Sequence, residues 1–157
     1  MNTKGIRISD IKDGKCIPLL ELLKDIPNAN DLNLAILWFS VTPLKGEGEF
    51  TTELQKKINE SKQVVFINIE SLREISKKIF QEIDLLVIGS KIKETLHRYE
   101  DDQEMYENCD IVIEMIDGGY WEVFSKNIDW INQLAKKYKE VEFLASDFQK
   151  KIPKAST

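Results

Sequence analysis

The chain has 157 residues, of which 42% are hydrophobic and 31% are charged, and its formal net charge is −5. This length fits one domain, which can bury about 70% of the surface that its unfolded chain exposes. The negative charge argues against a general nucleic-acid-binding protein, which would need an excess of lysine and arginine to neutralise phosphates. It is compatible with a basic protein partner.

Targeting and redox signals are sparse. No run approaches the roughly 18 apolar residues of a membrane span, and residues 1–6 lack the apolar core of a secretory signal. Cys16 and Cys109 are too few and too far apart to indicate a disulfide framework or a zinc site, so we interpret them as small buried thiols. These features predict a cytoplasmic protein without a membrane segment.

The first part of the chain mixes short strand and helix patterns. Residues 4–9 predict a first strand, and Pro18 opens a short leucine-rich helix, because proline is favoured at a first helical position. The apolar run 32–41 predicts a buried strand. A polar helix follows, for which Thr52 and Gln55 resemble a capping box.

The middle of the chain continues this mixture. Residues 63–69 predict a strand, and Ser71 with Glu74 predicts a capping box for the next helix. Apolar residues at helical spacing extend that helix to Phe80. Residues 84–89 predict a short buried strand.

The acidic run 100–104 predicts a helix start, because acidic side chains favour a helix N-terminus. Near the end of the chain, Asn127 or Ser125 can cap a helix, and residues 141–144 predict a last strand. Residues 149–157 predict a disordered basic tail.

The strongest local signal is a β-hairpin. Two β-rich runs, 111–116 and 120–125, flank Asp-Gly-Gly at 117–119, and glycine reaches the positive φ angles that tight turns need. Together the patterns predict one α+β domain over residues 1–148. Its sheet is expected to be mixed or mostly antiparallel, with this C-terminal hairpin and packed helices.

The hairpin register decides which side chains share a face. A two-residue Gly-Gly loop would place Ile116 opposite Trp121 and Met115 opposite Glu122. Both faces are then largely apolar, with Glu114 among apolar neighbours. Either helices cover both faces, or one face meets a partner, and a shift of one residue would change this division.

The hairpin also carries the candidate site residues. Glu114 lies near Asp117 and Glu122, and a buried carboxylate can act as a general acid or base. The alternative is a solvated carboxylate that discourages edge pairing. Tyr120 and Trp121 can be core residues or the anchors of an interface.

Other candidate sites are weaker. His97 is the only histidine and lies in a charged stretch without a nucleophile motif, and one histidine cannot build a histidine-rich metal site. The loop 45–49 follows a strand and precedes a helix, but it lacks the Gly-Lys-Ser/Thr ending of a phosphate loop. The acidic run 100–104 is a solvated face or a contact for a basic partner. No metal or cofactor is expected.

Four segments, 4–6, 84–88, 109–117 and 121–127, carry a resemblance that covers about half of the chain. In them the chain resembles a small family of uncharacterised proteins from spore-forming Gram-positive bacteria. The family has no established activity, so the resemblance assigns no catalytic residue. It implies a dispensable cytosolic bacterial protein encoded near interaction or toxin–immunity systems.

These observations favour a non-enzymatic protein-binding domain, in its most specific form an immunity-type protein that neutralises a toxin. Tyr120 and Trp121 would anchor a basic partner, and nearby carboxylates would steer its association. The alternative is a small-molecule-binding protein or hydrolase-like enzyme, which requires a pocket holding at least two of Glu114, Asp117 and Glu122. Self-association through the apolar back of the hairpin is a third hypothesis.

Overall fold

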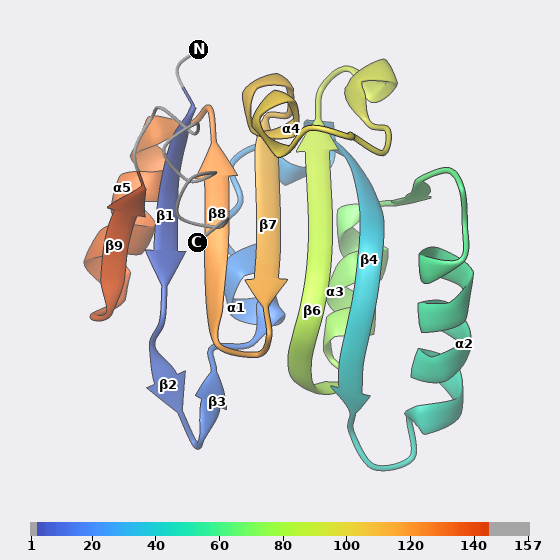
Figure 1. Ribbon diagram of the computed structural model, residues 1–157. Coiled ribbons are helices and arrows are strands. Elements are labelled where there is room, and N and C mark those ends of the chain that lie inside the picture. The colour runs from blue at the N-terminus through green and yellow to red at the C-terminus, as the bar shows by residue number, and fades with distance from the viewer. Residues whose placement is uncertain (1–2, 145–157) are drawn as a thin grey trace.

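A seven-stranded antiparallel sheet organises the computed structural model, which describes residues 3–144 (Figure 1). The strand order is β5-β4-β6-β7-β8-β1-β9, so the N-terminal strand lies between the hairpin and the last strand. The strands are β1 (Lys4–Ile8), β4 (Asn33–Pro43), β5 (Val65–Ile67), β6 (Ile79–Ser90), β7 (Ile111–Ile116), β8 (Tyr120–Ser125) and β9 (Val141–Leu144). A separate ribbon pairs β2 (Ile11–Lys12) with β3 (Lys15–Cys16). The predicted α+β class is confirmed, with the sheet antiparallel throughout.

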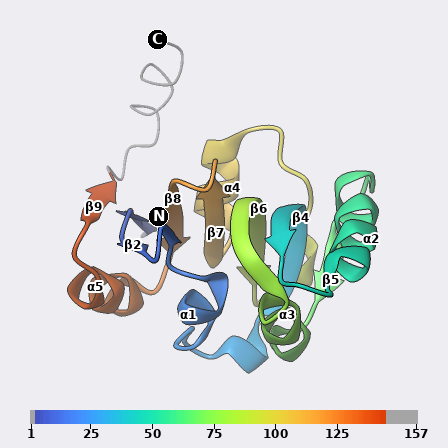
Figure 2. The same cartoon turned by 90° about the horizontal axis from the view of Figure 1, so that it is seen from below.

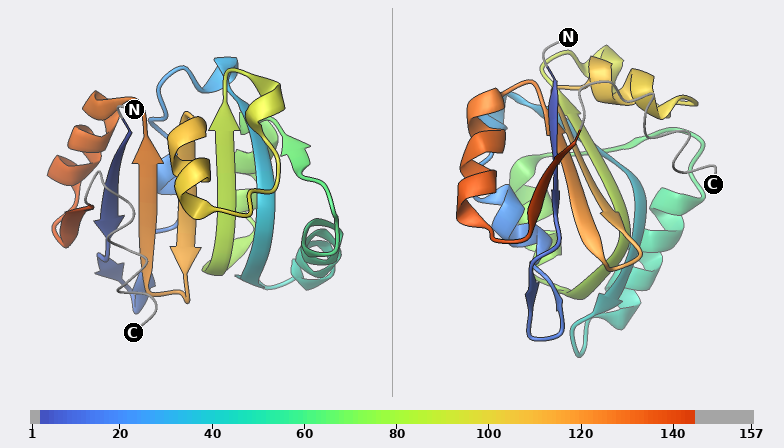
Figure 3. Two further views of the ribbon diagram at one scale, coloured as in Figure 1. Left: turned by 45° about the horizontal axis from the view of Figure 1, so that its top comes forward. Right: turned by 60° about the vertical axis from the view of Figure 1, so that its left-hand side comes forward.

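Helices cover the two faces of the sheet unequally. The helices are α1 (Leu19–Leu23), α2 (Gly48–Asn59), α3 (Ile69–Ser76), α4 (Asp102–Asn108) and α5 (Ile128–Lys137), with short 3-10 turns η1 (Ala29–Asp31) and η2 (Lys93–Thr95). Helices α1, α3 and α5 lie on one side, which we call the back face (Figure 2). Helix α4 lies on the opposite, front face, near one end of the strands (Figure 3).

Each face has its own core. The larger core lies between the back face and its helices and contains Trp121, Trp130 and Leu72, all buried. The smaller core lies under α4, where Tyr106 stacks on Phe124 with ring centroids 3.9 Å apart. The front face away from α4, toward the turn at 117–119, is not covered by any helix of residues 3–144 (Figure 1).

Asparagine and aspartate side chains, rather than the predicted capping boxes, begin three of the helices. Asn68 accepts a hydrogen bond from the Ser71 amide at 2.8 Å, so α3 begins two residues before the predicted capping serine. That helix ends at Ser76, and Phe80 belongs to β6 instead. The predicted Thr52 box is also wrong, because α2 begins at Gly48. Asp101 caps α4, and Asn127, as predicted, caps α5.

The hairpin turn has three residues, not two. Asp117 and Gly118 both have positive φ, 51° and 65°, and the Gly119 amide donates to the Ile116 carbonyl at 2.8 Å. Ile116 therefore pairs with Tyr120, and every residue of β8 moves to the face opposite the predicted one. The turn is also held by β6, because the Gly118 amide donates to the Ile83 carbonyl at 2.7 Å.

Helix α2 closes an edge of the sheet that β5 leaves open. Because β5 pairs with only the first part of β4, no strand within residues 3–144 lies beside the rest of β4 on this side. There the Asn59 side chain accepts from the Phe39 amide and donates to the Phe39 carbonyl, both at 2.9 Å. The Val41 amide donates to Gln55 at 3.4 Å. These side chains occupy backbone groups that would otherwise be open to pairing.

Candidate functional site

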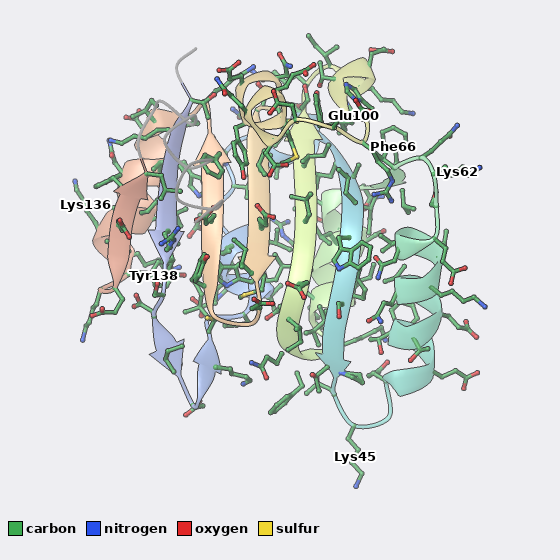
Figure 4. All side chains as sticks on the ribbon, in the orientation of Figure 1. Lys45, Lys62, Phe66, Glu100, Lys136 and Tyr138 are labelled. Carbon is green, nitrogen blue, oxygen red and sulfur yellow. The ribbon has the colours of Figure 1, made fainter. Side chains whose placement is uncertain are left out.

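A row of polar and aromatic side chains crosses the front face beside the area that α4 covers. Directly paired residues of antiparallel strands point to the same face, with Cβ atoms about 5 Å apart. The register places the following residues side by side, from β4 to β9: Trp38, Leu86, Glu114, Glu122, Arg7 and Glu142. We call this set the front row. Figure 4 views the sheet from the front face, on which the front row lies.

Arg7 forms the electrostatic centre of the front row. Its Nη2 and Nε donate to Glu122 Oε2 at 2.7 and 3.1 Å, and its Nη1 lies 3.7 Å from Glu142. Its guanidinium also lies over the Tyr120 ring, 4.4 Å from the centroid. Burial alone would lower the pKa of Arg7, but the hydrogen bond and the charge of Glu122 raise it. Glu122, which is 2% exposed, is thus a buried ion-pair partner.

Glu114 lies between this ion pair and the smaller core. It faces Glu122 across the hairpin, and Tyr106 Oη on α4 donates to its Oε1 across 3.5 Å. Burial and the neighbouring Glu114 carboxylate raise the pKa of Tyr106, so this phenol stays protonated and remains a donor. Helix α4 therefore fixes one side of the Glu114 carboxylate.

A groove of about 260 Å³ lies at the other end of the front row. Its lining residues are Trp38, Asp84, Leu85, Leu86, Glu114, Met115 and Ile116. Two carboxylates and an indole ring thus surround an apolar floor. Asp84 also accepts a hydrogen bond from the Asp117 amide at 3.0 Å, which ties the hairpin turn to this groove. We call it the Trp38 groove.

The structure separates the predicted site residues. Trp121 was expected to anchor a partner, but it is 0% exposed and its Nε1 donates to the Ile17 carbonyl at 2.8 Å. The expectation is wrong because the three-residue turn places Trp121 on the back face. Tyr120 is half-buried on the front face beside Arg7.

The three candidate carboxylates have different surroundings within residues 3–144. Glu114 and Glu122 face each other, but Glu122 is buried against Arg7, and Asp117 lies exposed on the turn. Of the three, the Trp38 groove contains only Glu114. The Trp38 groove therefore does not meet the requirement of the enzyme hypothesis for a pocket with two of these carboxylates.

Sequence reasoning missed Arg7, Trp38, Asp84 and Tyr106 as site residues. Trp38 was assigned to a buried strand, and its run of apolar neighbours gave no indication of its exposure. Arg7 and Tyr106 reach the site only because the sheet brings β1 beside β8 and because α4 packs on the front face. The pattern of the hairpin alone held no signal for them.

The remaining candidates have ordinary structural positions. His97 is exposed beside Tyr99, with ring centroids 3.9 Å apart, and Glu47 of the 45–49 loop pairs with Lys78 at 3.2 Å. Cys16 and Cys109 are free and buried, as predicted, and burial raises the pKa of Cys109 to about 11. Within residues 3–144, no group of His, Cys, Asp and Glu side chains is arranged to hold a metal ion.

No model of a known protein family, no curated protein and no solved structure matches this chain. Indications of its function therefore come from the chain itself, above all from its front face. None of the helices within residues 3–144 has the length and apolar character of a membrane-crossing helix. The predicted basic tail, 149–157, lies outside the described residues.

Proposed function

We propose that this protein is a non-enzymatic protein-binding domain that binds a basic partner through the uncovered part of its front face. The observation that carries the proposal is the front row beside the Trp38 groove, where carboxylates outnumber the single arginine on a surface that no described helix covers. Surface carboxylates steer a basic partner into contact, and an exposed indole supplies apolar contact area. The net charge of −5 acts in the same direction.

The most specific form of the proposal is an immunity-type protein that blocks a basic cleft of a toxin. The resemblance of four segments to uncharacterised proteins of spore-forming bacteria agrees with this form. The contact surface differs from the predicted one, because Trp38 replaces Trp121 as the exposed indole.

Affinity capture with matched baits tests the proposal. The wild-type chain, the double variant Asp84→Asn/Glu114→Gln and the control Glu49→Gln/Glu53→Gln are immobilised and exposed to native lysate. The control removes two exposed carboxylates of α2, neither of which lines the groove. A basic protein should be retained in stoichiometric amount by the wild type and the control, released by salt, and lost with the groove variant.

Two outcomes would refute the proposal: no stoichiometric partner, or a partner that all three baits retain equally. For the immunity form, the captured protein expressed alone must inhibit growth. Co-expression of the wild-type chain must then restore growth, while the groove variant restores it less.

A further inference from the structure

The exposed phenylalanine rings in residues 3–144 each lie beside a lysine side chain. Every exposed phenylalanine of this range has a lysine ammonium over its ring, at distances from 4.4 to 5.2 Å. The pairs are Phe143 with Lys4, Phe80 with Lys15, Phe50 with Lys78, and Phe66 with Lys93. Phe66 is labelled at the β5 edge in Figure 4. The chain thus covers these rings with its own cations.

Trp38 is the exception. It is 45% exposed, yet none of the cation–π contacts formed within residues 3–144 involves its ring. Indole binds cations more strongly than a phenyl or phenol ring does. Trp38 therefore has the ring type that attracts a cation most strongly, and no cation of residues 3–144 lies over it.

The other end of the front row shows what a complete arrangement looks like. There Arg7 stacks on Tyr120 and also pairs with Glu122 and Glu142, so one guanidinium meets a ring and two carboxylates. The Trp38 groove offers the same set of groups. Trp38 supplies the ring, Asp84 and Glu114 supply the carboxylates, and no basic residue of the described chain lines the groove.

We propose that the Trp38 groove binds an arginine side chain of the protein partner. Arginine fits better than lysine, because its planar guanidinium can stack on the indole while its N–H groups donate to carboxylates on either side. The apolar floor at Leu86 accommodates the aliphatic stem. This inference rests on the proposed function only for the origin of the arginine; the site itself is testable without the partner.

The test is a nuclear magnetic resonance titration of the whole chain with acetyl-Gly-Arg-Gly-amide. The matched probe is acetyl-Gly-citrulline-Gly-amide, which keeps the shape of arginine but has no charge. The arginine peptide should shift the Trp38 indole N–H signal and the Leu86 and Glu114 amide signals in the millimolar range, and added salt should weaken the effect. The citrulline peptide should bind about tenfold more weakly.

Two variants complete the experiment. Trp38→Leu removes the ring from an exposed position and should weaken binding about tenfold. Phe66→Leu removes an exposed ring that already has Lys93 over it, and binding should not change. Equal binding of the two peptides, no shift at Trp38, or unchanged binding by Trp38→Leu would each overturn the proposal.

The two proposals fail in different ways. A partner that is lost with Asp84→Asn/Glu114→Gln but kept with Trp38→Leu would uphold the protein-binding function and overturn the arginine site. Peptide binding at Trp38 without any captured partner would uphold the site and refute the proposed function.

Discussion

Trp121 and Trp38 lie on opposite faces of one sheet and show how differently the two faces are used. Trp121 is fully buried among back-face helices, with its indole N–H bonded to a backbone carbonyl. Trp38 is 45% exposed beside a groove that carries carboxylates. Trp121 contributes to the stability of the core, whereas Trp38 lies on the part of the front face that no helix of residues 3–144 covers and adds little to it. Substitutions on the two faces should therefore separate folding from binding.

The largest effect is expected from Trp121→Ala. Removing a buried indole leaves a cavity in the larger core and should lower the free energy of unfolding by about 3–5 kcal/mol. The matched change Trp38→Ala removes an exposed ring and should cost less than about 0.5 kcal/mol. Urea denaturation followed by circular dichroism measures both, and similar losses for the two would contradict the comparison.

Arg7→Leu tests the contribution to stability of the Arg7–Glu122 ion pair on the front face. The substitution removes the arginine that pairs with the buried Glu122 carboxylate at 2.7 Å, which should lower the free energy of unfolding by about 3 kcal/mol at pH 7. The double variant Arg7→Leu/Glu122→Leu removes both charges and should recover most of the loss. A double variant as unstable as Arg7→Leu alone would show that lost packing, and not the broken ion pair, causes the loss.

Asn59→Ala should have a smaller effect, about 1–2 kcal/mol, because it removes both hydrogen bonds to the backbone of Phe39. Glu53→Ala, on the exposed side of the same helix, is the control and should change stability little. Denaturant midpoints compare them. Light scattering of the Asn59 variant should also increase, since part of the β4 edge is then open.

Glu82→Gln should change the dependence of stability on pH. Glu82 is 4% exposed and accepts a hydrogen bond from the Leu19 amide, but burial outweighs this bond and raises its pKa above the ordinary value of 4.5. The folded state therefore holds this proton more tightly than the unfolded state, so stability falls as pH rises through the interval between the two pKa values. Wild type should lose stability relative to Glu82→Gln across that interval. Parallel curves for the two proteins would exclude this role.

Local patterns predicted the elements better than the site. The strands at 111–116, 120–125 and 141–144 match their predicted bounds, because apolar β-rich runs and Asp-Gly-Gly are strong local signals. The predicted turn length of two residues is wrong, because Asp117, a non-glycine residue, adopts a positive φ and joins the turn. The resulting register places Trp121 on the back face and Glu122 beside Arg7.

The site depends on contacts that no local pattern contains. Arg7 meets Glu122 only because β1 inserts between β8 and β9, and a strand order of this kind is set by the packing of the whole chain. Trp38 follows the bulge at Leu37, a local irregularity that apolar periodicity does not reveal. Residues far apart in sequence therefore build the surface, and only the folded chain shows them together.

The amide of Asn59 has a consequence for how the sheet ends. The Asn59 side chain accepts from the Phe39 amide and donates to the Phe39 carbonyl, as the backbone of one residue in a neighbouring strand would. Strand pairing can continue from one molecule to the next, and unpaired backbone groups at a sheet edge favour the growth of fibres. Here a side chain of α2 occupies the backbone groups of Phe39, so that pairing at this point of the edge is blocked without an additional strand.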